Sequence, residues 1–270
     1  MNNTEPSQKT EDHRESQRDM DRVGITLAGS ETVSRYGSAN AEFIKGYTGV
    51  DNETGQKMAR GLAAVYEYKL NSDPVEAAKN IKQQAGFSAE IASTSRDNKK
   101  AIIEGSDQRT WRSDDVSEYG PNHNVVDRVQ VLNGKIVDGS QSQMKFVGNR
   151  DQLFERIAKE DGEFARYRGV KLELPSEQFE GAQEYCQQKA KELREQALKV
   201  ERIGKPVEAA KLRAKADNYD QLAKSVRDSG LTTDDAIFYR KNPKLATALD
   251  IARTSHDAGI EAAKFGSALG

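Results

Sequence analysis

Hydrophobic spacing divides the chain into a polar start, a mixed middle and a long helical end. Residues 1–35 show no hydrophobic periodicity, which predicts a disordered tail. Three later segments have apolar residues three or four positions apart, the spacing of a helix with one buried face. Ser72 is the expected N-cap of the third of them, with Pro74 in its first turn. The three segments are 41–47, 52–70 and 72–93.

The stretch from Val125 to Phe146 alternates in the manner of two paired strands. Its centre holds Asn133-Gly134, the preferred dipeptide of a two-residue type I′ turn. Strands are therefore expected near 125–132 and 135–147, followed by a helix over 150–167. A third strand is expected over 169–174, and a short one around Arg109–Arg112 in the preceding loop.

The last third of the chain is predicted to form helices with a narrow, alanine-rich face. Apolar residues recur three and four apart over 177–202 and again over 206–228, with Gly204-Lys205-Pro206 as the corner of an antiparallel hairpin. Two further helices follow, the first capped by Thr232 or Thr233.

These elements predict an α+β or α/β fold, mostly helical, with a small mixed sheet and an appended helical hairpin. The expected parts are a tail at 1–35, an α/β domain at 36–175, the helical hairpin at 176–228 and C-terminal helices at 229–270.

Composition narrows the classes of function. The chain has 270 residues, a net charge of −2 and 31% charged residues, so it is not a polybasic nucleic-acid binder as a whole, although a local basic face is compatible. One cysteine and three histidines make neither an internal disulfide nor a zinc site. Without a signal peptide or an apolar stretch of ~18 residues, a cytoplasmic protein with no membrane span is expected.

Strand alternation brings a carboxylate, an amide and an amine together. Asp127 on the first strand and Gln143 and Lys145 on the second fall on one face if the two faces coincide. Glu90 is the only acid in the stretch KNIKQQAGFSAEIAS of the helix before them. The elements thus follow the order helix with Glu, strand with Asp, strand with Gln-x-Lys, helix, strand.

This order resembles the PD-(D/E)xK nuclease superfamily, in the variant where glutamine replaces the second acid. "VVD" stands for the Pro-Asp element, with Val126 at the proline position, and "QMK" for the (D/E)xK element. The resemblance covers about residues 73–175. From the hairpin onward the chain also resembles uncharacterised bacterial proteins with similar "SQMKFVG" segments, a likeness that implies no activity.

A phosphodiester-cleaving site explains these residue types. Mg²⁺ or Mn²⁺ prefers oxygen ligands, which Asp127, Glu90 and the carbonyl of Met144 would supply. Gln143 would hold a metal-bound water, and Lys145 would orient the attacking water or offset charge on the phosphate. The resemblance implies DNA or RNA as substrate, and by analogy a bacterial toxin or phage-defence role.

Two loop features have open interpretations. Arg109, Trp111 and Arg112 are candidates for contact with a nucleic-acid strand, although Trp111 is equally suited to anchor the loop. His123 is either a second proton carrier or, more simply, a turn histidine.

Two further functions compete with the nuclease. One is a non-enzymatic helical adaptor that binds a protein through 177–228, and the other is an inactive nuclease fold that binds nucleic acid. Self-association or partner contact is expected at 177–228 and at the small-residue face of 258–270.

Overall fold

The computed structural model describes residues 30, 31 and 33–267, and in this part of the chain the fold is α+β and mostly helical. Of the predicted tail, residues 1–29 lie outside the described residues, whereas 33–35 already belong to a helix that continues to residue 48. Tyr36, Ala39 and Phe43 of this N-terminal helix are buried. Their spacing of three and four residues is that of one helical face.

The predicted helix over 52–70 is wrong except for one short piece. Only α2, Leu62–Tyr66, is helical, and residues 49–61 form a loop. Gly61 explains the difference, because a Cβ atom there would lie 2.4 Å from the backbone nitrogen of Gly49. Gly55, with a φ of 74°, forms a left-handed turn that also interrupts the helical pattern.

The long helix α3 spans Pro74–Ile103 and covers one face of the sheet. Its N-cap is Asp73 and not the predicted Ser72, since the Asp73 carboxylate accepts the N–H groups of Val75 and Glu76. Pro74 occupies the first helical position as expected. Gly86 sits within the helix with open space around it, so it is a tolerated weak point.

A mixed six-stranded sheet lies beside α3 in the described chain. Its order is β1-β2-β4-β5-β6, with β3 paired to β2. The pairs β1–β2, β2–β3 and β2–β4 are antiparallel, whereas β4–β5 and β5–β6 are parallel. The strands are β1 Arg109–Arg112, β2 Arg128–Leu132, β3 Lys135–Ile136, β4 Ser142–Met144, β5 Lys171–Leu174 and β6 Val226–Asp228.

The turn at Asn133-Gly134 is confirmed, with φ values of 51° and 74° at its two central residues. The short strand near Arg109–Arg112 is confirmed as well. The single second strand over 135–147 is wrong, because the chain leaves the sheet after Ile136, turns at Gly139 and re-enters as β4. Strand β6 was not predicted, since its parallel partner lies more than 50 residues earlier.

Two hydrophobic cores lie on opposite faces of the sheet. Leu172 and Leu174 of β5 face one core with α4 (Arg150–Ala158), the 3-10 segment Glu163–Tyr167 and helices α6 and α7. Met144 of β4 faces the other, with α2, α3, α8 (Thr233–Lys241) and α9 (Pro243–Ser267). The predicted helix over 150–167 is interrupted, because α4 ends at Ala158 with Lys159 extended and the 3-10 segment begins only after Gly162, where a Cβ atom would lie 2.9 Å from the carbonyl oxygen of Arg156.

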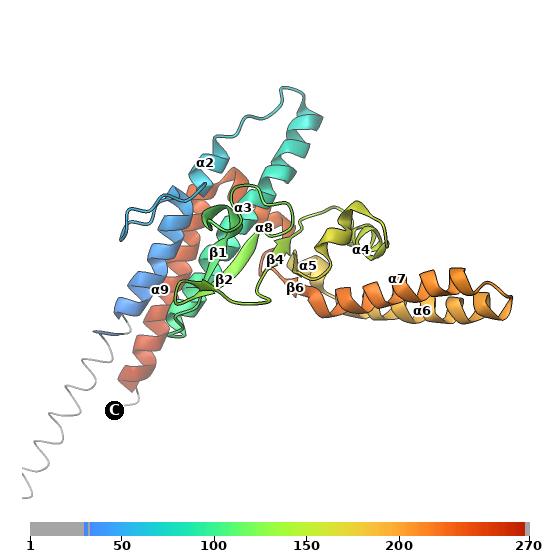
Figure 1. Ribbon diagram of the computed structural model, residues 1–270. Helices are drawn as coiled ribbons and strands as arrows, with labels where there is room; N and C mark the ends of the chain where they lie inside the picture. Colours follow the sequence, from blue (N-terminus) through green and yellow to red (C-terminus); the bar gives the residue numbers. More distant parts are fainter. Residues whose placement is uncertain (1–29, 32, 268–270) are drawn as a thin grey trace, which may run out of the picture.

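Helices α6 (Ala182–Arg202) and α7 (Pro206–Ser225) run side by side and project from the body of the molecule (Figure 1). The short helix α5, Ser176–Phe179, precedes them. Arg194 pairs with Asp217 and Asp220 across the two helices, at 2.7 and 2.6 Å. The facing residues are small, and Ala190, Ala197, Ala209 and Ala216 are fully buried.

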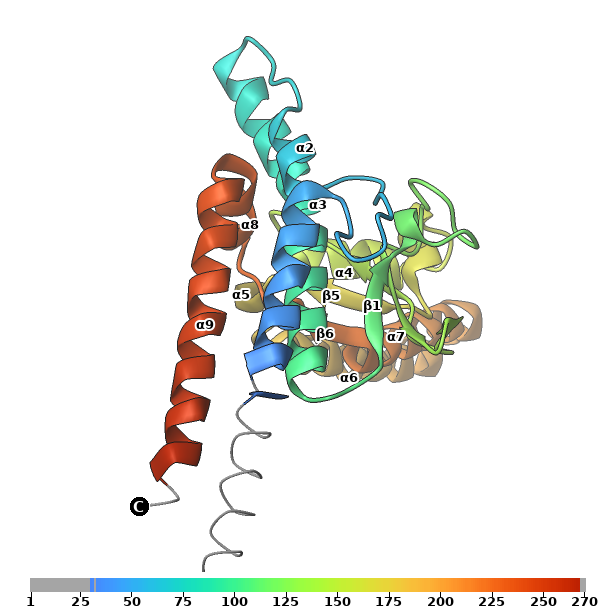
Figure 2. The same ribbon diagram turned by 90° about the vertical axis from the view of Figure 1, so that its left-hand side faces the viewer.

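The C-terminal helices belong to the body of the fold. Thr232 caps α8 in a capping box with Asp235, as predicted for one of the two threonines. Helix α9 runs beside the N-terminal helix and α3 (Figures 1 and 2), with Lys99 paired to Asp257 at 3.8 Å. Strand β6 joins the sheet and its Val226 lies in the core with α6 and α7, whereas α8 packs in the core with α3. The expected domain boundaries at 175 and 228 stay a prediction. For the predicted face at 258–270, the described side chains include Ala258, which is partly buried.

Arg128 of β2 links three elements at the centre of the fold. It is only 2% exposed, its guanidinium pairs with Asp97 of α3 and lies 3.3 Å from Glu173 of β5, and it donates to Ser93 at 2.6 Å. A buried charge that loses its partner is costly, at ~3–5 kcal/mol.

We expect Arg128→Ala to lower the free energy of unfolding by ~3–5 kcal/mol, because it leaves the Glu173 carboxylate uncompensated. Asp97→Ala is the matched control and should cost ~1 kcal/mol or less, since the Asp97 side chain is 46% exposed. Urea denaturation measures both. Equal losses in the two variants would contradict the central role of Arg128.

Candidate functional site

Asp127 and Gln143 lie together at the junction of β2 and β4. Asp127 directly precedes β2, and its N–H donates to the carbonyl oxygen of Ser142 at 2.8 Å. Its Oδ2 atom accepts the backbone N–H of Met144 at 2.7 Å and the side-chain Nε2 of Gln143. These bonds leave Oδ1 of Asp127 without a hydrogen bond from the part of the chain that the structure describes.

Gln143 has one unpaired polar atom. Its side chain is 3% exposed, and its Oε1 atom has no hydrogen-bond partner among the described residues. The amide Nε2 lies 3.5 Å from the carbonyl oxygen of Met144, so this carbonyl is beside the Asp127–Gln143 pair. A buried acceptor left open in this way is a feature that a bound water or cation would satisfy.

Lys145 follows β4 directly and is partly exposed. Its Nζ atom lies 4.5 Å from the centroid of the Tyr167 ring, a cation–π contact that holds the ammonium group in place. Its charge is near enough to Asp127 to act on the pKa of that carboxyl group. The structure therefore brings Gln143 into contact with Asp127 and leaves Lys145 near enough to act on Asp127 electrostatically.

Glu90 approaches this group from α3. Burial raises the pKa of Glu90 to about 8, and the negative charge of Asp127 acts in the same direction. Arg112 and Arg60 partly oppose the shift. Neither arginine lies within ion-pair distance of Glu90, and no hydrogen bond joins Glu90 to Asp127 within the described chain.

Burial also raises the pKa of Asp127, to about 6. The Met144 N–H and the Lys145 charge lower it, while Glu173 and Asp114 raise it. Two neighbouring carboxyl groups with raised pKa values are costly to ionise together. Such pairs are typical of sites that bind a cation or transfer a proton.

The donor set fits a hard cation that keeps several of its waters. No group of three or more histidine, cysteine, aspartate or glutamate side chains within residues 30, 31 and 33–267 is arranged to hold a metal. Mg²⁺ needs fewer charged ligands, because one or two carboxylates with carbonyl oxygens and water suffice. Asp127 Oδ1, Glu90, Gln143 Oε1 and the Met144 carbonyl provide such atoms.

Several charged residues near the site could not be assigned to it from the sequence. Arg60 pairs with Asp114 at 2.6 Å, and both act on the pKa of Glu90. They come from separate loops, so only the tertiary fold brings them there. His123 has a structural role, since its Nδ1 accepts the N–H groups of Val125 and Val126 at 3.3 and 2.9 Å. This cap fixes the chain just before Asp127.

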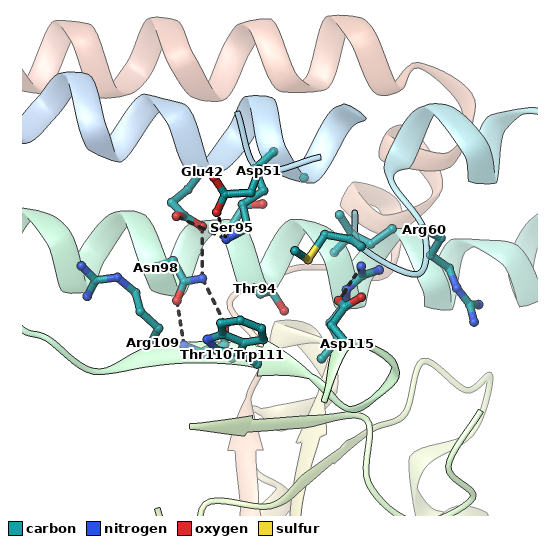
Figure 3. Close-up of a pocket in the computed structure, with 15 residues that line it drawn as sticks. Glu42, Asp51, Arg60, Thr94, Ser95, Asn98, Arg109, Thr110, Trp111 and Asp115 are labelled. Carbon is teal, nitrogen blue, oxygen red and sulfur yellow. Dashed lines mark hydrogen bonds and ion pairs between the residues drawn. The ribbon is translucent and has the colours of Figure 1, made fainter. Parts of the chain in front are cut away.

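The three residues expected to contact nucleic acid have different environments. Arg112 is 5% exposed and pairs with Asp115 at 2.7 Å, so it lies in a buried ion pair, and its contact with nucleic acid stays a prediction. Arg109 donates to the carbonyl oxygen of Gln108 at 2.9 Å. Trp111 lines a cavity of about 210 Å³ between β1, α3 and the N-terminal helix (Figure 3).

Comparisons with known proteins give no family for this chain. No protein-family model, no curated protein and no solved structure matches it. Among the described helices, none combines the length and the apolar character that a membrane crossing requires.

The raised pKa of Glu90 predicts how stability depends on pH. The native carboxyl keeps its proton up to about pH 8, whereas the unfolded chain releases it near pH 4.5. Stability therefore falls as pH rises through this interval. Glu90→Gln cannot ionise, so its melting temperature should fall less between pH 5 and pH 8 in the presence of a chelator.

Glu104→Gln is the control for this measurement, because the Glu104 side chain is 59% exposed at the end of α3. It should follow the parent protein. A Glu90→Gln variant with the same pH dependence as the parent would show that Glu90 ionises normally.

Proposed function

We propose that this protein is a metal-dependent nuclease that cleaves phosphodiester bonds of DNA or RNA. The observation that carries the proposal is the hydrogen-bonded pair of Asp127 and Gln143, with Lys145 and the raised-pKa carboxyl of Glu90 beside it. Neighbouring carboxyl groups with raised pKa values are typical of sites that bind a cation or transfer a proton.

The order of the elements adds support. Helix α3 carries Glu90, Asp127 precedes β2, Gln143 and Met144 lie on β4, and α4 and β5 follow. This is the order on which the resemblance to PD-(D/E)xK nucleases rests. The strands β2 and β4 are antiparallel neighbours, which accounts for the contact between the aspartate and the Gln-x-Lys segment.

In this proposal, Asp127 and Glu90 hold the cation, with the Met144 carbonyl and Gln143 Oε1 as further oxygen atoms. When bound, the Mg²⁺ or Mn²⁺ ion acidifies a water and offsets charge on the phosphate. The buried amide of Gln143 keeps Asp127 in one orientation through its Nε2. Lys145, held against Tyr167, offsets the negative charge that develops on the attacked phosphate.

A non-enzymatic adaptor is the second candidate, and one observation favours it. Near the free end of the α6–α7 hairpin, Leu198, Ile203 and Val207 are 51%, 70% and 66% exposed. Apolar side chains gathered at the tip of a projecting element suit contact with another protein. Such contact is also compatible with a nuclease that is recruited to its substrate.

We expect the purified protein to cut nucleic acid with Mg²⁺ or Mn²⁺ and to stop when the metal is chelated. Asp127→Ala removes a metal ligand, and Lys145→Ala removes the charge beside the phosphate. Each should lower the rate by ~10²–10³-fold. A gel assay with single- and double-stranded DNA and RNA measures this loss.

Asp138→Ala and Lys135→Ala are matched controls, because both side chains are exposed on the same hairpin. They should cut at the parent rate, and thermal melting should show that all four variants are folded. The proposal fails if no substrate is cut, or if Asp127→Ala and Lys145→Ala cut as well as their controls.

Gln143→Glu tests the amide separately. It places a carboxylate beside Asp127, which matches the commoner acid of the superfamily pattern. We expect the variant to retain Mn²⁺ binding by calorimetry, since a third carboxylate adds an oxygen ligand. Loss of Mn²⁺ binding in this variant would indicate that the amide is needed for packing and not for the cation.

A further inference from the structure

Trp111, the single tryptophan of the chain, belongs to neither hydrophobic core. It lies on β1, and its ring is drawn at the floor of the cavity below Glu42 and Asp51 (Figure 3). The Nζ atom of Lys45 lies 5.7 Å from the ring centroid. The ring thus faces a space lined by polar and charged groups, where an aromatic ligand can stack on it.

The cavity has the lining of a site for one planar, polar ring. Its volume of about 210 Å³ is below the ~300–1,000 Å³ of sites for drug-sized ligands, so it suits a single ring system. Apolar contact comes from Met58 and Ile91 beside Trp111. Carboxylates, guanidinium groups and the Lys45 ammonium group also line it, so a ring with both donors and acceptors on its edge finds partners there. A nucleobase has this chemistry.

The cavity adjoins the proposed catalytic group. Arg60 and Arg112 line it, and the same two charges lower the pKa of Glu90. Thr94, another lining residue, lies one turn beyond Glu90 on α3 and donates to the Glu90 carbonyl at 2.7 Å. Thr94 thus lies about 6 Å from Glu90 along the axis of α3, which is roughly the length of two stacked nucleotides at ~3.4 Å each.

The cavity also continues away from Glu90. A second cavity of about 390 Å³ shares Glu42, Lys45, Asp51 and Arg109 with it and extends past Arg35 of the N-terminal helix. Arg35, Lys45 and Arg109 line this path together with Glu42, Asp51 and Glu53, and Lys45 pairs with Asp51 at 3.2 Å, so the lining offers both hydrogen-bond donors and acceptors.

We propose that the Trp111 cavity takes one unpaired nucleobase of the substrate, which makes the preferred substrate a single strand or an unpaired segment. This inference rests on the proposed nuclease function. A base inside a duplex is stacked on both faces and paired on its edge, so it cannot enter a cavity that holds a single ring. Base stacking on an aromatic ring tolerates any sequence, because every base has a π face.

Intrinsic fluorescence tests this directly, because all tryptophan emission comes from Trp111. In the presence of a chelator, the protein is titrated with a short single-stranded oligonucleotide, its duplex and a mononucleotide. We expect the single strand to quench the emission at a concentration at least ~10-fold below that needed for either of the others. Equal quenching by the duplex overturns the single-strand inference, and equal quenching by the mononucleotide overturns the assignment to a strand.

Binding of a labelled single strand, measured by fluorescence anisotropy, tests the ring itself. Trp111→Ala should weaken binding by about 5- to 150-fold, and Trp111→Phe should recover much of the loss. Tyr66→Ala is the control, because this exposed aromatic lies outside the cavity. If Trp111→Ala binds as the parent does, the inference is overturned. Asp127→Ala should keep the quenching, so loss of cleavage and loss of base binding are separate outcomes.

Discussion

The buried guanidinium of Arg128 is the constraint on which the relative placement of helix and sheet depends. It pairs with a carboxylate from α3 and another from β5, while its own strand pairs with β1 and β4. A charge in this position is tolerable because Glu173, which is itself largely buried, compensates it, while Asp97 adds a more exposed partner. The register of α3 against the sheet is thereby fixed, and Glu90 lies two turns before Asp97 on the same helix.

The candidate site follows from this arrangement. Arg128 faces α3 through Ser93, while Asp127, just before it, bonds to Gln143 and to the backbone of Met144 on β4. The site forms where the antiparallel part of the sheet meets the parallel part, at the carboxyl end of β4. Loops are free to gather at such an edge, and the segments around residues 60 and 114 bring further charges there.

Local patterns predicted the parts of this structure that local chemistry determines. The Asn133-Gly134 turn, the cap at Thr232 and the closeness of Asp127 to Gln143 all follow from backbone preference and strand alternation. The helix expected over 52–70 failed because Gly61 packs against the backbone of Gly49, a contact between residues twelve positions apart.

Long-range partners account for the remaining differences. Arg112 is buried because Asp115 pairs with it and because Asp115 also accepts the N–H of Ala59 from a distant loop. Strand β6 forms by pairing with β5, and its three residues are too few to show the alternation of apolar and polar residues that predicts a strand. The cavity at Trp111 is formed by three separate elements, so the sequence alone could not decide whether this ring contacts nucleic acid or anchors its loop.

The connection between β5 and β6 has a consequence for how the chain can vary. Parallel neighbours require a crossover of a dozen or more residues, and here helices α5, α6 and α7 supply it. The α6–α7 hairpin is joined to the sheet through β5 before it and β6 after it. The residues around Gly204, at its far end, are exposed to solvent. Insertions or deletions of equal length in both arms would therefore lengthen or shorten the projection without moving either strand. The length of the α6–α7 hairpin can therefore change independently of the position of Asp127.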